Sequence, residues 1–266
     1  MVRKIAGAVK RKLNARAVKW ERKHHGVTSE KIFFLHIPKC GGTSVIQALH
    51  HKFQPENIQS LNPFASTEVS RSLNMDLMAF REYILLYSLA TPSCRHVTGH
   101  YVWSDKAHQI HGQSWKFITI LRHPVDKWFS QYYFNRYKDV DHFQINVDVE
   151  SFINSQAGKD LGNDQINKLS DATITLPEKM LEAALTNLDK FDVIGVTEHL
   201  SRFQQDFNSQ FKTSLNIPHL NKNPAQNRKL QASDNPDVRE QVEELCKRDM
   251  ILYQAALDKL GLPHPA

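Results

Sequence analysis

Two adjacent glycines that follow an apolar run limit how this chain can fold more than any other feature. In FFLHIPKCGGTS (residues 33–44) the apolar run is typical of a buried strand, in a chain with only 10 glycines. Thr43 and Ser44 are common helix-capping residues, and the apolar residues after them predict a helix over 43–52. A strand, a glycine turn and a helix start point backbone N–H groups at an anion, and Lys39 adds a cation. The stretch therefore predicts a phosphate-binding loop.

Apolar runs alternate with helical patterns along most of the chain. Short apolar runs predict strands at 31–37, 95–102, 115–122 and 191–196. Helical spacing predicts helices over 43–52 and 76–89, from Pro124 onward, from Glu198 to Phe211, and as one long closing helix after a polar loop at 216–236. Residues 53–75 are expected to be mainly loop. Strands that alternate with helices predict an α/β fold, with a mostly parallel sheet flanked by helices.

The loop differs from that of the common nucleoside triphosphatases. Their pattern, G-x-x-x-x-G-K-[ST], has the lysine after the glycines, whereas Lys39 precedes them here. Those enzymes also hold Mg²⁺ with an acidic residue at the end of a neighbouring buried strand. The best candidate strand, in ITILRHP, is followed by Arg122, which would repel a metal ion but attract a second phosphate. The sequence thus predicts a ligand with two separated anionic groups and no metal.

Two motifs in this order resemble one enzyme family. HIPKCGGTS is similar to the 5′-phosphosulfate loop H-I-P-K-T-G-G-T-S of the carbohydrate sulfotransferases related to heparan sulfate 2-O-sulfotransferase, and RHPVDKWFS resembles their 3′-phosphate site, with Arg122 and Ser130. FDVIGVTEHLSRF resembles the family more weakly, and the resemblance spans roughly residues 31–260. It implies a P-loop-like sulfotransferase fold and 3′-phosphoadenosine 5′-phosphosulfate (PAPS) as the co-substrate.

The chemistry of sulfuryl transfer suits the residues of these motifs. Negative charge grows on the bridging oxygen of the leaving phosphate, where a lysine and backbone N–H groups stabilise it. Arg122 can donate two hydrogen bonds to a phosphate, and the hydroxyl of Ser130 can add a third. The expected contacts to the 5′ end are Lys39, which we also expect to be catalytic, Cys40, Gly41, Gly42, Thr43 and Ser44.

Cys40 stands where the family usually has threonine. One interpretation is a small side chain that the loop tolerates. The other is a thiol made acidic by the helix N-terminus and Lys39, which alkylation would modify unless nucleotide protects it.

Transfer to a hydroxyl also requires a base. RHVTGHYVW offers His96 and His100, whose spacing of four could suggest a metal pair on a helix, but residues 97–99 are poor helix formers. The Gly-His pair resembles the catalytic H-G-H stretch of the family, in which the second histidine matches His100 and Thr98 replaces the first. We therefore expect His100 to be the base.

A second group of phosphate contacts is implied only by the resemblance. The segment NKNPAQNRK (221–229) is rich in cations and amides, and the family has a loop there that closes over the nucleotide. Arg228 and Lys229 are the candidate contacts. A solvated loop is the alternative.

Most of the positive charge lies at the start of the chain. Residues 1–25 hold nine Lys or Arg and one acidic residue, Glu21, so their net charge is +8. Because the whole chain has a net charge of +6, residues 26–266, the expected sulfotransferase domain, carry −2. Apolar residues at helical spacing make 1–25 a candidate basic amphipathic helix. Such a helix could contact an anionic membrane or simply be solvated. We expect no nucleic-acid partner, and the nearly neutral domain argues weakly against a densely sulfated polymer as substrate.

The apolar stretches and the cysteine content fit a cytoplasmic protein. The longest apolar stretch, near 83–90, is too short to span a bilayer, and residues 1–25 lack the apolar core of a secretory signal. The three cysteines are too few and too scattered for a disulfide framework. A luminal Golgi-type domain trimmed of its anchor would look the same.

The sequence predicts a PAPS-dependent sulfotransferase that transfers a sulfuryl group to a hydroxyl, and the resemblance implies a carbohydrate acceptor. The alternatives are a P-loop-type nucleotide kinase or NTPase, and a non-catalytic nucleotide-binding protein. Contacts to the acceptor are expected from the loops at 53–75, 100–112 and 138–170. Aromatic residues that could either stack on a sugar ring or pack in the core are Tyr101, Trp103, Tyr132 and Tyr133.

Overall fold

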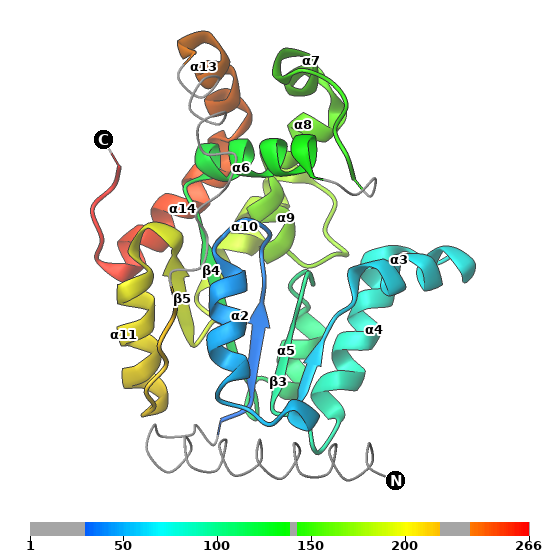
Figure 1. Cartoon of the computed structure of the whole chain (residues 1–266), viewed down its shortest axis with the longest axis vertical. Coiled ribbons are helices and arrows are strands. Elements are labelled where there is room, and N and C mark those ends of the chain that lie inside the picture. Colours follow the sequence, from blue (N-terminus) through cyan, green and yellow to red (C-terminus); the bar gives the residue numbers. More distant parts are fainter. Residues whose placement is uncertain (1–29, 139–142, 219–234, 266) are drawn as a thin grey trace, which may run out of the picture.

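Five parallel strands form the centre of the computed structural model, which describes residues 30–138, 143–218 and 235–265. The strands are β1 (Ile32–Leu35), β2 (Ile58–Ser60), β3 (His96–Gly99), β4 (Lys116–Leu121) and β5 (Val193–Val196). Their order across the sheet is β2-β3-β1-β4-β5 (Figure 1). The chain therefore passes from β1 toward one edge of the sheet and from β4 toward the other. In a parallel sheet the crevice between two such strands, at their carboxyl ends, is where ligands bind.

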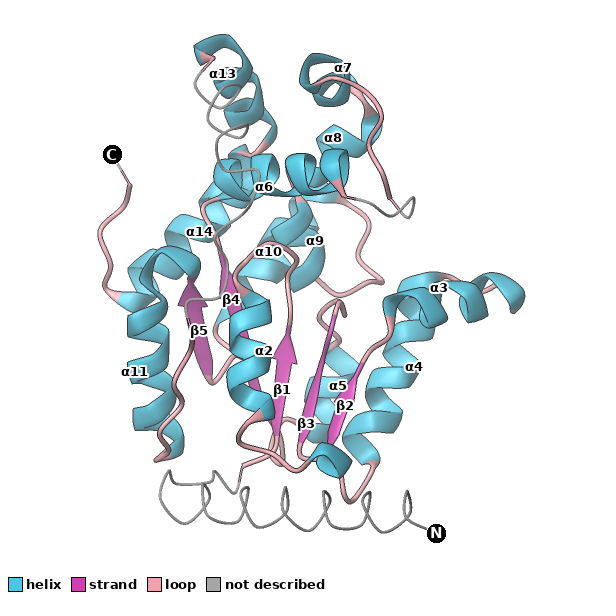
Figure 2. Ribbon diagram, viewed as in Figure 1, coloured by secondary structure: helices cyan, strands magenta, loops and turns pink. Residues whose placement is uncertain are grey.

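Helices cover both faces of the sheet (Figure 2). They are α2 (Gly42–His50), α3 (Pro63–Ser72), α4 (Leu77–Ala90), α5 (Asp105–His111), α6 (Pro124–Tyr137), α7 (Val149–Asn154), α8 (Gln156–Leu161), α9 (Asp164–Leu169), α10 (Pro177–Leu188), α11 (Leu200–Phe211), α13 (Pro236–Leu245) and α14 (Lys247–Leu260), with short 3₁₀ turns η1 (Pro55–Asn57) and η2 (Thr197–His199). In Figure 1, α2 lies in front of the sheet, whereas α5 and α10 lie behind it. The predicted α/β fold is confirmed.

The strands are apolar throughout because both of their faces are covered. All four residues of β1 and of β5 are buried, as are five of the six residues of β4. A parallel sheet with helices on both faces requires such continuous apolar runs rather than alternation. This is why the three strands could be predicted from composition alone.

A second apolar cluster lies beyond the carboxyl edge of the sheet. It is formed mainly by α6, α7 and α13, which lie above the strands in Figure 1, and its largest members are Trp128, Phe129, Tyr132, Tyr133 and Phe152. Trp128 is fully buried, and its indole N–H donates to the carbonyl of Gly158 at 2.9 Å. The cluster holds α6 in place directly after Arg122.

All four aromatic residues considered for sugar stacking are buried. Tyr101 and Trp103 belong to the main core, and Tyr132 and Tyr133 belong to the second cluster, each with at most 4% of its surface exposed. Core packing therefore accounts for them.

All three segments expected to be loops contain regular structure. Residues 53–75 hold the edge strand β2 and helix α3, residues 100–112 hold α5, and residues 138–170 hold α7, α8 and α9. The expected closing helix is two helices that meet at Cys246. Short elements such as three-residue β2 lack enough repeats of a pattern to be recognised.

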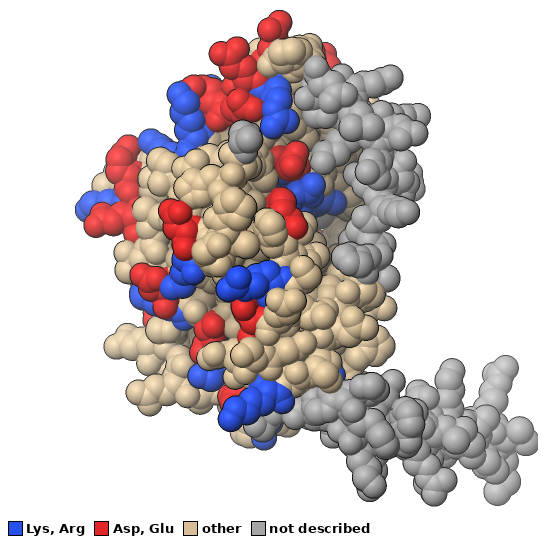
Figure 3. Space-filling model, turned by 90° about the vertical axis from the view of Figure 1, so that its left-hand side faces the viewer, with Lys and Arg blue, Asp and Glu red and all other residues tan. Residues whose placement is uncertain are grey.

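Charges of both signs are interspersed on the face at the left of Figure 1, where α11 and α14 lie (Figure 3). No extended area of one sign stands out there among the described residues. None of the described helices is long and apolar enough to cross a membrane.

Phe207 makes the packing of α11 on the sheet testable. It is fully buried between Phe203 and Phe211 on the face of α11 that covers β5. We expect Phe207→Ala to lower the free energy of unfolding by about 3–5 kcal/mol, because it leaves a cavity in a close-packed core. Exposed Gln205 on the same helix is the control, and Gln205→Ala should change stability by less than about 0.5 kcal/mol in the same urea titration. Similar losses in both variants would contradict this packing.

Candidate active site

The loop between β1 and α2 turns through left-handed backbone. Lys39 has φ 65° and Gly41 has φ 70°, and Gly41 is the N-cap of α2 with no side-chain cap. The expectation that Thr43 and Ser44 cap the helix is wrong, because both lie within its first turn, where Thr43 is exposed and Ser44 is buried. The first backbone N–H groups of a helix have no partner within the helix, so this turn presents donors suited to an anion.

Gly42 is required because the ring of His36 lies where a larger side chain would stand. A Cβ at Gly42 would come within 2.0 Å of that ring. The His36 ring also packs against Phe34, at 5.6 Å between centroids, and against His100, at 4.7 Å. The loop thus brings a histidine from the end of β1 to the histidine that follows β3.

Lys39 connects the loop to Arg122, just before α6, and to Phe134, in the last turn of α6. Its carbonyl accepts a hydrogen bond from Nη1 of Arg122 at 3.0 Å, and its Nζ lies 3.9 Å from the centre of the Phe134 ring. The two predicted anion-binding residues therefore lie side by side at the carboxyl ends of β1 and β4. Ser130 is buried within α6, eight residues after Arg122.

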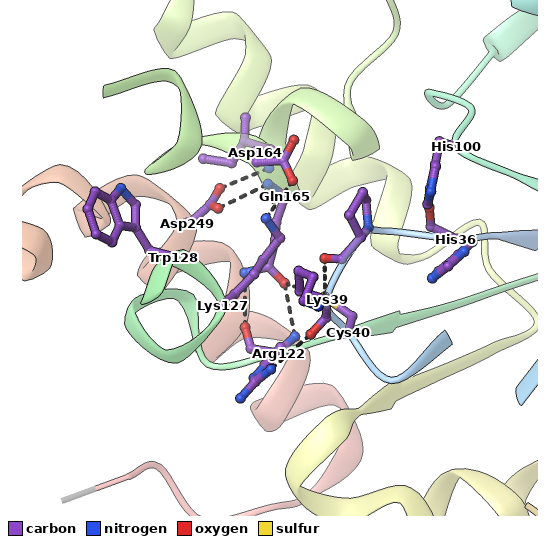
Figure 4. A network of polar contacts seen from close by, with 12 residues as sticks. His36, Lys39, Cys40, His100, Arg122, Lys127, Trp128, Asp164, Gln165 and Asp249 are labelled. Carbon is purple, nitrogen blue, oxygen red and sulfur yellow. Dashed lines mark hydrogen bonds and ion pairs between the residues drawn. The ribbon is translucent and has the colours of Figure 1, made fainter. Parts of the chain in front are cut away.

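Arg122 is held by its backbone as well as by its guanidinium. The side-chain amide of Gln165 accepts from the N–H of Arg122 and donates to its carbonyl, each at 3.0 Å (Figure 4). Gln165 comes from α9, and its own N–H donates to the carboxylate of Asp249 at 3.0 Å. Sequence reasoning missed both residues.

A partly buried ion pair lies beside this network. Lys127 of α6, 1% exposed, contacts a carboxylate oxygen of Asp164 at 2.5 Å. Burial alone would lower the pKa of Lys127, but the Asp164 carboxylate raises it above its usual value. Burial would likewise raise the pKa of Asp164, but the positive charges of Lys127 and Lys168 hold it below the usual range. Both groups therefore stay charged at neutral pH. Lys127 lies within the quoted motif RHPVDKWFS, so its proximity to Arg122 was visible in the sequence, but its partner was not.

His100 lies at the carboxyl end of β3 with a defined tautomer. Its Nδ1 is 3.0 Å from the carbonyl oxygen of His36, and a carbonyl only accepts, so Nδ1 carries the proton and Nε2 keeps its lone pair. Burial lowers the pKa of His100, helped by the nearby charges of Lys168 and Arg81 and opposed by its hydrogen bond to His36 and by Asp164. The ring is therefore neutral at pH 7 and can take a proton at Nε2.

His96 lies at the opposite end of β3. It is fully buried, its Nδ1 contacts the carbonyl of Ile32 at 3.2 Å, and burial lowers its pKa to about 3. Thr98, which replaces a histidine of the family pattern, is buried and donates to the carbonyl of Phe34. Of the two candidate bases, only His100 lies at the carboxyl edge with Lys39 and Arg122.

Cys40 is not an activated thiol. It is 1% exposed, its Sγ contacts the carbonyl of Pro38 at 3.6 Å, and burial raises its pKa to about 12 despite the nearby charges of Lys127 and Arg122. Burial outweighs the effect of the helix N-terminus, so the interpretation as a tolerated small side chain agrees with the structure.

Arg228, Lys229 and the basic segment 1–25 lie outside the described residues. Within the parts of the chain that are described, no three His, Cys, Asp or Glu side chains gather closely enough to hold a metal ion.

The buried thiols lead to a direct measurement. Cys40, Cys94 and Cys246 are all free and at most 1% exposed, and burial raises the pKa of each. We expect a thiol reagent to modify none of them rapidly in the folded protein and all three in denaturant, because only the exposed thiolate reacts. Rapid modification of one cysteine that nucleotide prevents would show that the loop exposes Cys40 in solution.

Comparison with known proteins gives the family. A family model described as "Sulfotransferase domain" matches residues 29–173. A sulfotransferase from Alicyclobacillus acidocaldarius is 16% identical, covers 86% of this chain and 100% of its own, and has a TM-score of 0.37. The mouse sulfotransferase SULT7A1 complexed with PAP is 15% identical, covers 81% of this chain and 88% of its own, and has a TM-score of 0.26. Likenesses this weak carry no argument about the site.

No curated protein matches the chain in the corresponding sequence comparison. The family match, however, spans more than half of the chain and includes the loop after β1, His100, Arg122 and Gln165. The chain therefore belongs to the sulfotransferase domain family.

Proposed function

We propose that the protein is a PAPS-dependent sulfotransferase that transfers a sulfuryl group to a hydroxyl of a carbohydrate. The observation that carries the proposal is the hydrogen bond between the Arg122 guanidinium and the Lys39 carbonyl, which joins the two residues predicted to bind anions, at the carboxyl ends of β1 and β4. PAPS has two anionic groups, a 5′-phosphosulfate and a 3′-phosphate. The Lys39 ammonium and the Arg122 guanidinium would each bind one of these two groups.

The residues of this edge fit such a nucleotide. The left-handed turn at Gly41 leaves the first turn of α2 without a side-chain cap, so the N–H groups of Gly42, Thr43 and Ser44 can bind the 5′ end. Arg122 would bind the 3′-phosphate, with Ser130 as a second donor. Bound PAPS supplies a sulfuryl group on a phosphate leaving group. Lys39 would leave the ring of Phe134 and place its ammonium where charge grows on the leaving oxygen.

His100 would remove the proton of the acceptor hydroxyl. Its Nε2 takes the proton, and the hydrogen bond from Nδ1 to the His36 carbonyl keeps the ring in the orientation that leaves Nε2 available. The same carbonyl also stabilises the protonated ring, because the hydrogen bond that it accepts from Nδ1–H becomes stronger when the ring is positively charged.

The carbohydrate acceptor rests on the motifs. HIPKCGGTS and RHPVDKWFS resemble those of the enzymes related to heparan sulfate 2-O-sulfotransferase, which act on sugars. The cytoplasmic location and a membrane contact through residues 1–25 remain predictions from the sequence.

Titration with adenosine 3′,5′-bisphosphate, with and without Mg²⁺, tests the proposal against a kinase or NTPase. We expect tight binding that does not depend on Mg²⁺, because Arg122 and Lys39 supply the positive charge. Turnover of labelled PAPS with a panel of sugar acceptors then separates an enzyme from a binding protein. Binding that requires Mg²⁺ would favour the kinase alternative.

Arg122→Ala should lower the affinity for adenosine 3′,5′-bisphosphate by about tenfold or more, because a charge-assisted phosphate contact contributes about 1.5–3 kcal/mol. Adenosine 5′-monophosphate, which lacks the 3′-phosphate, should bind the variant nearly as well as the wild type. Isothermal titration with both ligands checks this. Equal weakening of both would mean that Arg122 does not contact the 3′-phosphate.

His100→Ala should lower kcat by about 10²–10⁴-fold and leave nucleotide affinity intact, as expected for loss of a general base. The neutral ring is the active form and burial lowers its pKa, so wild-type activity should persist at neutral pH and decline only below pH 6.5, the ordinary value. The variant should lack this acidic decline.

His96→Ala is the matched control, because His96 lies at the other end of the same strand. It should retain the acidic decline. Near-normal turnover of His100→Ala would place the base elsewhere.

A further inference from the structure

The side chain of Gln165 is fully buried and bonds mainly one residue, Arg122, while its Oε1 also lies 4.0 Å from Sγ of Cys40. Its exposed fraction is 0%, and both halves of its amide bond the backbone of Arg122, with Oε1 accepting from the N–H and Nε2 donating to the carbonyl, each at 3.0 Å (Figure 4). Together these two bonds satisfy the backbone donor and acceptor of a single residue.

Arg122 needs this partner because it lies beyond the sheet. Pairing of β4 with β1 ends at Thr119, and pairing with β5 ends at Leu121. The peptide groups on both sides of Arg122 therefore have no neighbouring strand to fix them. Side chains hold them instead: the amide of Gln165 bonds the N–H and carbonyl of Arg122 itself, while Thr197 donates to the carbonyl of Leu121 and Glu198 accepts from the N–H of His123, each at 3.0 Å.

Gln165 is fixed in turn by a residue from the end of the chain. The two carboxylate oxygens of Asp249 accept from the N–H groups of Gln165 at 3.0 Å and Ile166 at 2.9 Å, and Asp249 is 1% exposed. Helix α14 thus holds the first turn of α9, and α9 holds Arg122. The order of contacts runs from Asp249 through Gln165 and Arg122 to the carbonyl of Lys39.

We propose that Gln165 is a positioning residue for nucleotide recognition, whose buried amide holds the backbone of Arg122 so that the guanidinium is aligned for the 3′-phosphate before the nucleotide binds. The inference rests on the proposed function, because it assigns Gln165 to the 3′-phosphate end of that site. Gln165 itself does not contact the ligand.

A side chain fixed in advance binds more tightly because less freedom is lost on binding. Removing the amide leaves the guanidinium in place but allows the backbone that carries it to shift. The loss should therefore fall on the 3′-phosphate and spare the 5′ end. A merely structural role would weaken both ends alike.

The experiment measures one ratio, the affinity for adenosine 3′,5′-bisphosphate divided by that for adenosine 5′-monophosphate. Gln165→Met has a similar length and deletes both hydrogen bonds without adding charge. We expect it to lower the ratio by about fivefold to tenfold, in line with the loss of two hydrogen bonds. In the Arg122→Ala background the same substitution should change the ratio no further.

Gln165→Glu provides a rescue by pH. A protonated carboxyl group can accept from the N–H of Arg122 and donate to its carbonyl as the amide does, whereas a carboxylate repels that carbonyl. Burial raises the pKa of a glutamate, so the carboxyl group should become protonated as the pH falls from about 8 to about 5. Over that range the affinity ratio of the variant should rise toward the ratio of the wild type measured at the same pH. Comparison with the wild type at the same pH cancels the titration of the ligand's own phosphates. This variant also serves if Gln165→Met does not fold.

Asn187→Leu is the matched control. Asn187 is 2% exposed, and its amide donates to the carbonyl of Leu169 at 2.8 Å, so it holds the opposite end of α9. It should leave the ratio unchanged even where it lowers the melting temperature. A fall in the ratio that matches Gln165→Met would mean that any loosening of α9 has the same effect and would overturn the proposal.

Two further results are decisive. An unchanged ratio in Gln165→Met, or equal weakening of both nucleotides, would overturn the positioning role while leaving the proposed function intact. If instead the wild type does not favour the bisphosphate, or Arg122→Ala does not alter the ratio, the proposed function itself fails and the inference fails with it.

Discussion

The hydrogen bond from Arg122 to the carbonyl of Lys39 is the contact on which this edge of the molecule depends. It forms because the connections after β1 and β4 leave toward opposite edges of the sheet and open a crevice between their carboxyl ends. The carbonyl of Lys39 faces Arg122 from a loop with left-handed backbone at Lys39 and Gly41. The contact thus depends both on the backbone conformation of one turn and on the order of the strands in the sheet.

Buried polar groups hold the rest of the edge. An unpaired buried donor or acceptor costs about 1–3 kcal/mol, and a buried charge costs more, so each must have a partner. Gln165 bonds the backbone of Arg122, Asp249 bonds the first turn of α9, and Lys127 pairs with Asp164. Such a network stabilises little on balance, but it permits only one arrangement, because moving one member leaves several groups without partners. The backbone of Arg122 is therefore held in one position by this network.

The sequence predicted what depends on neighbouring residues and missed what depends on distant ones. The apolar runs of β1, β4 and β5 predicted the sheet, and the residues after those runs predicted Lys39 and Arg122, which the structure brings into contact. Gln165 lies 43 residues from Arg122, and Asp249 lies 84 residues further on, so no local pattern could join them. Cys40 shows what a local pattern leaves open. Its neighbours allowed either an acidic thiol or a tolerated small side chain, and burial, which raises its pKa, decides between them.

The surroundings of His100 show how the fold compensates for a change in a motif. Thr98 replaces the first histidine of the family pattern and packs its hydroxyl against the carbonyl of Phe34, so β3 offers only one histidine to the site. The ring of His36 approaches His100 to 4.7 Å from the neighbouring strand instead. Burial lowers the pKa of His36 to about 3, with smaller effects from His100 once that ring is protonated and from the charge of Lys39, so this second ring stays neutral and cannot act as an acid at physiological pH. His36 therefore contributes through its carbonyl, which orients His100, and through its ring, which fills the space that Gly42 leaves open. His100 is thus one neutral ring with a fixed tautomer, and the second ring beside it comes from the neighbouring strand rather than from β3.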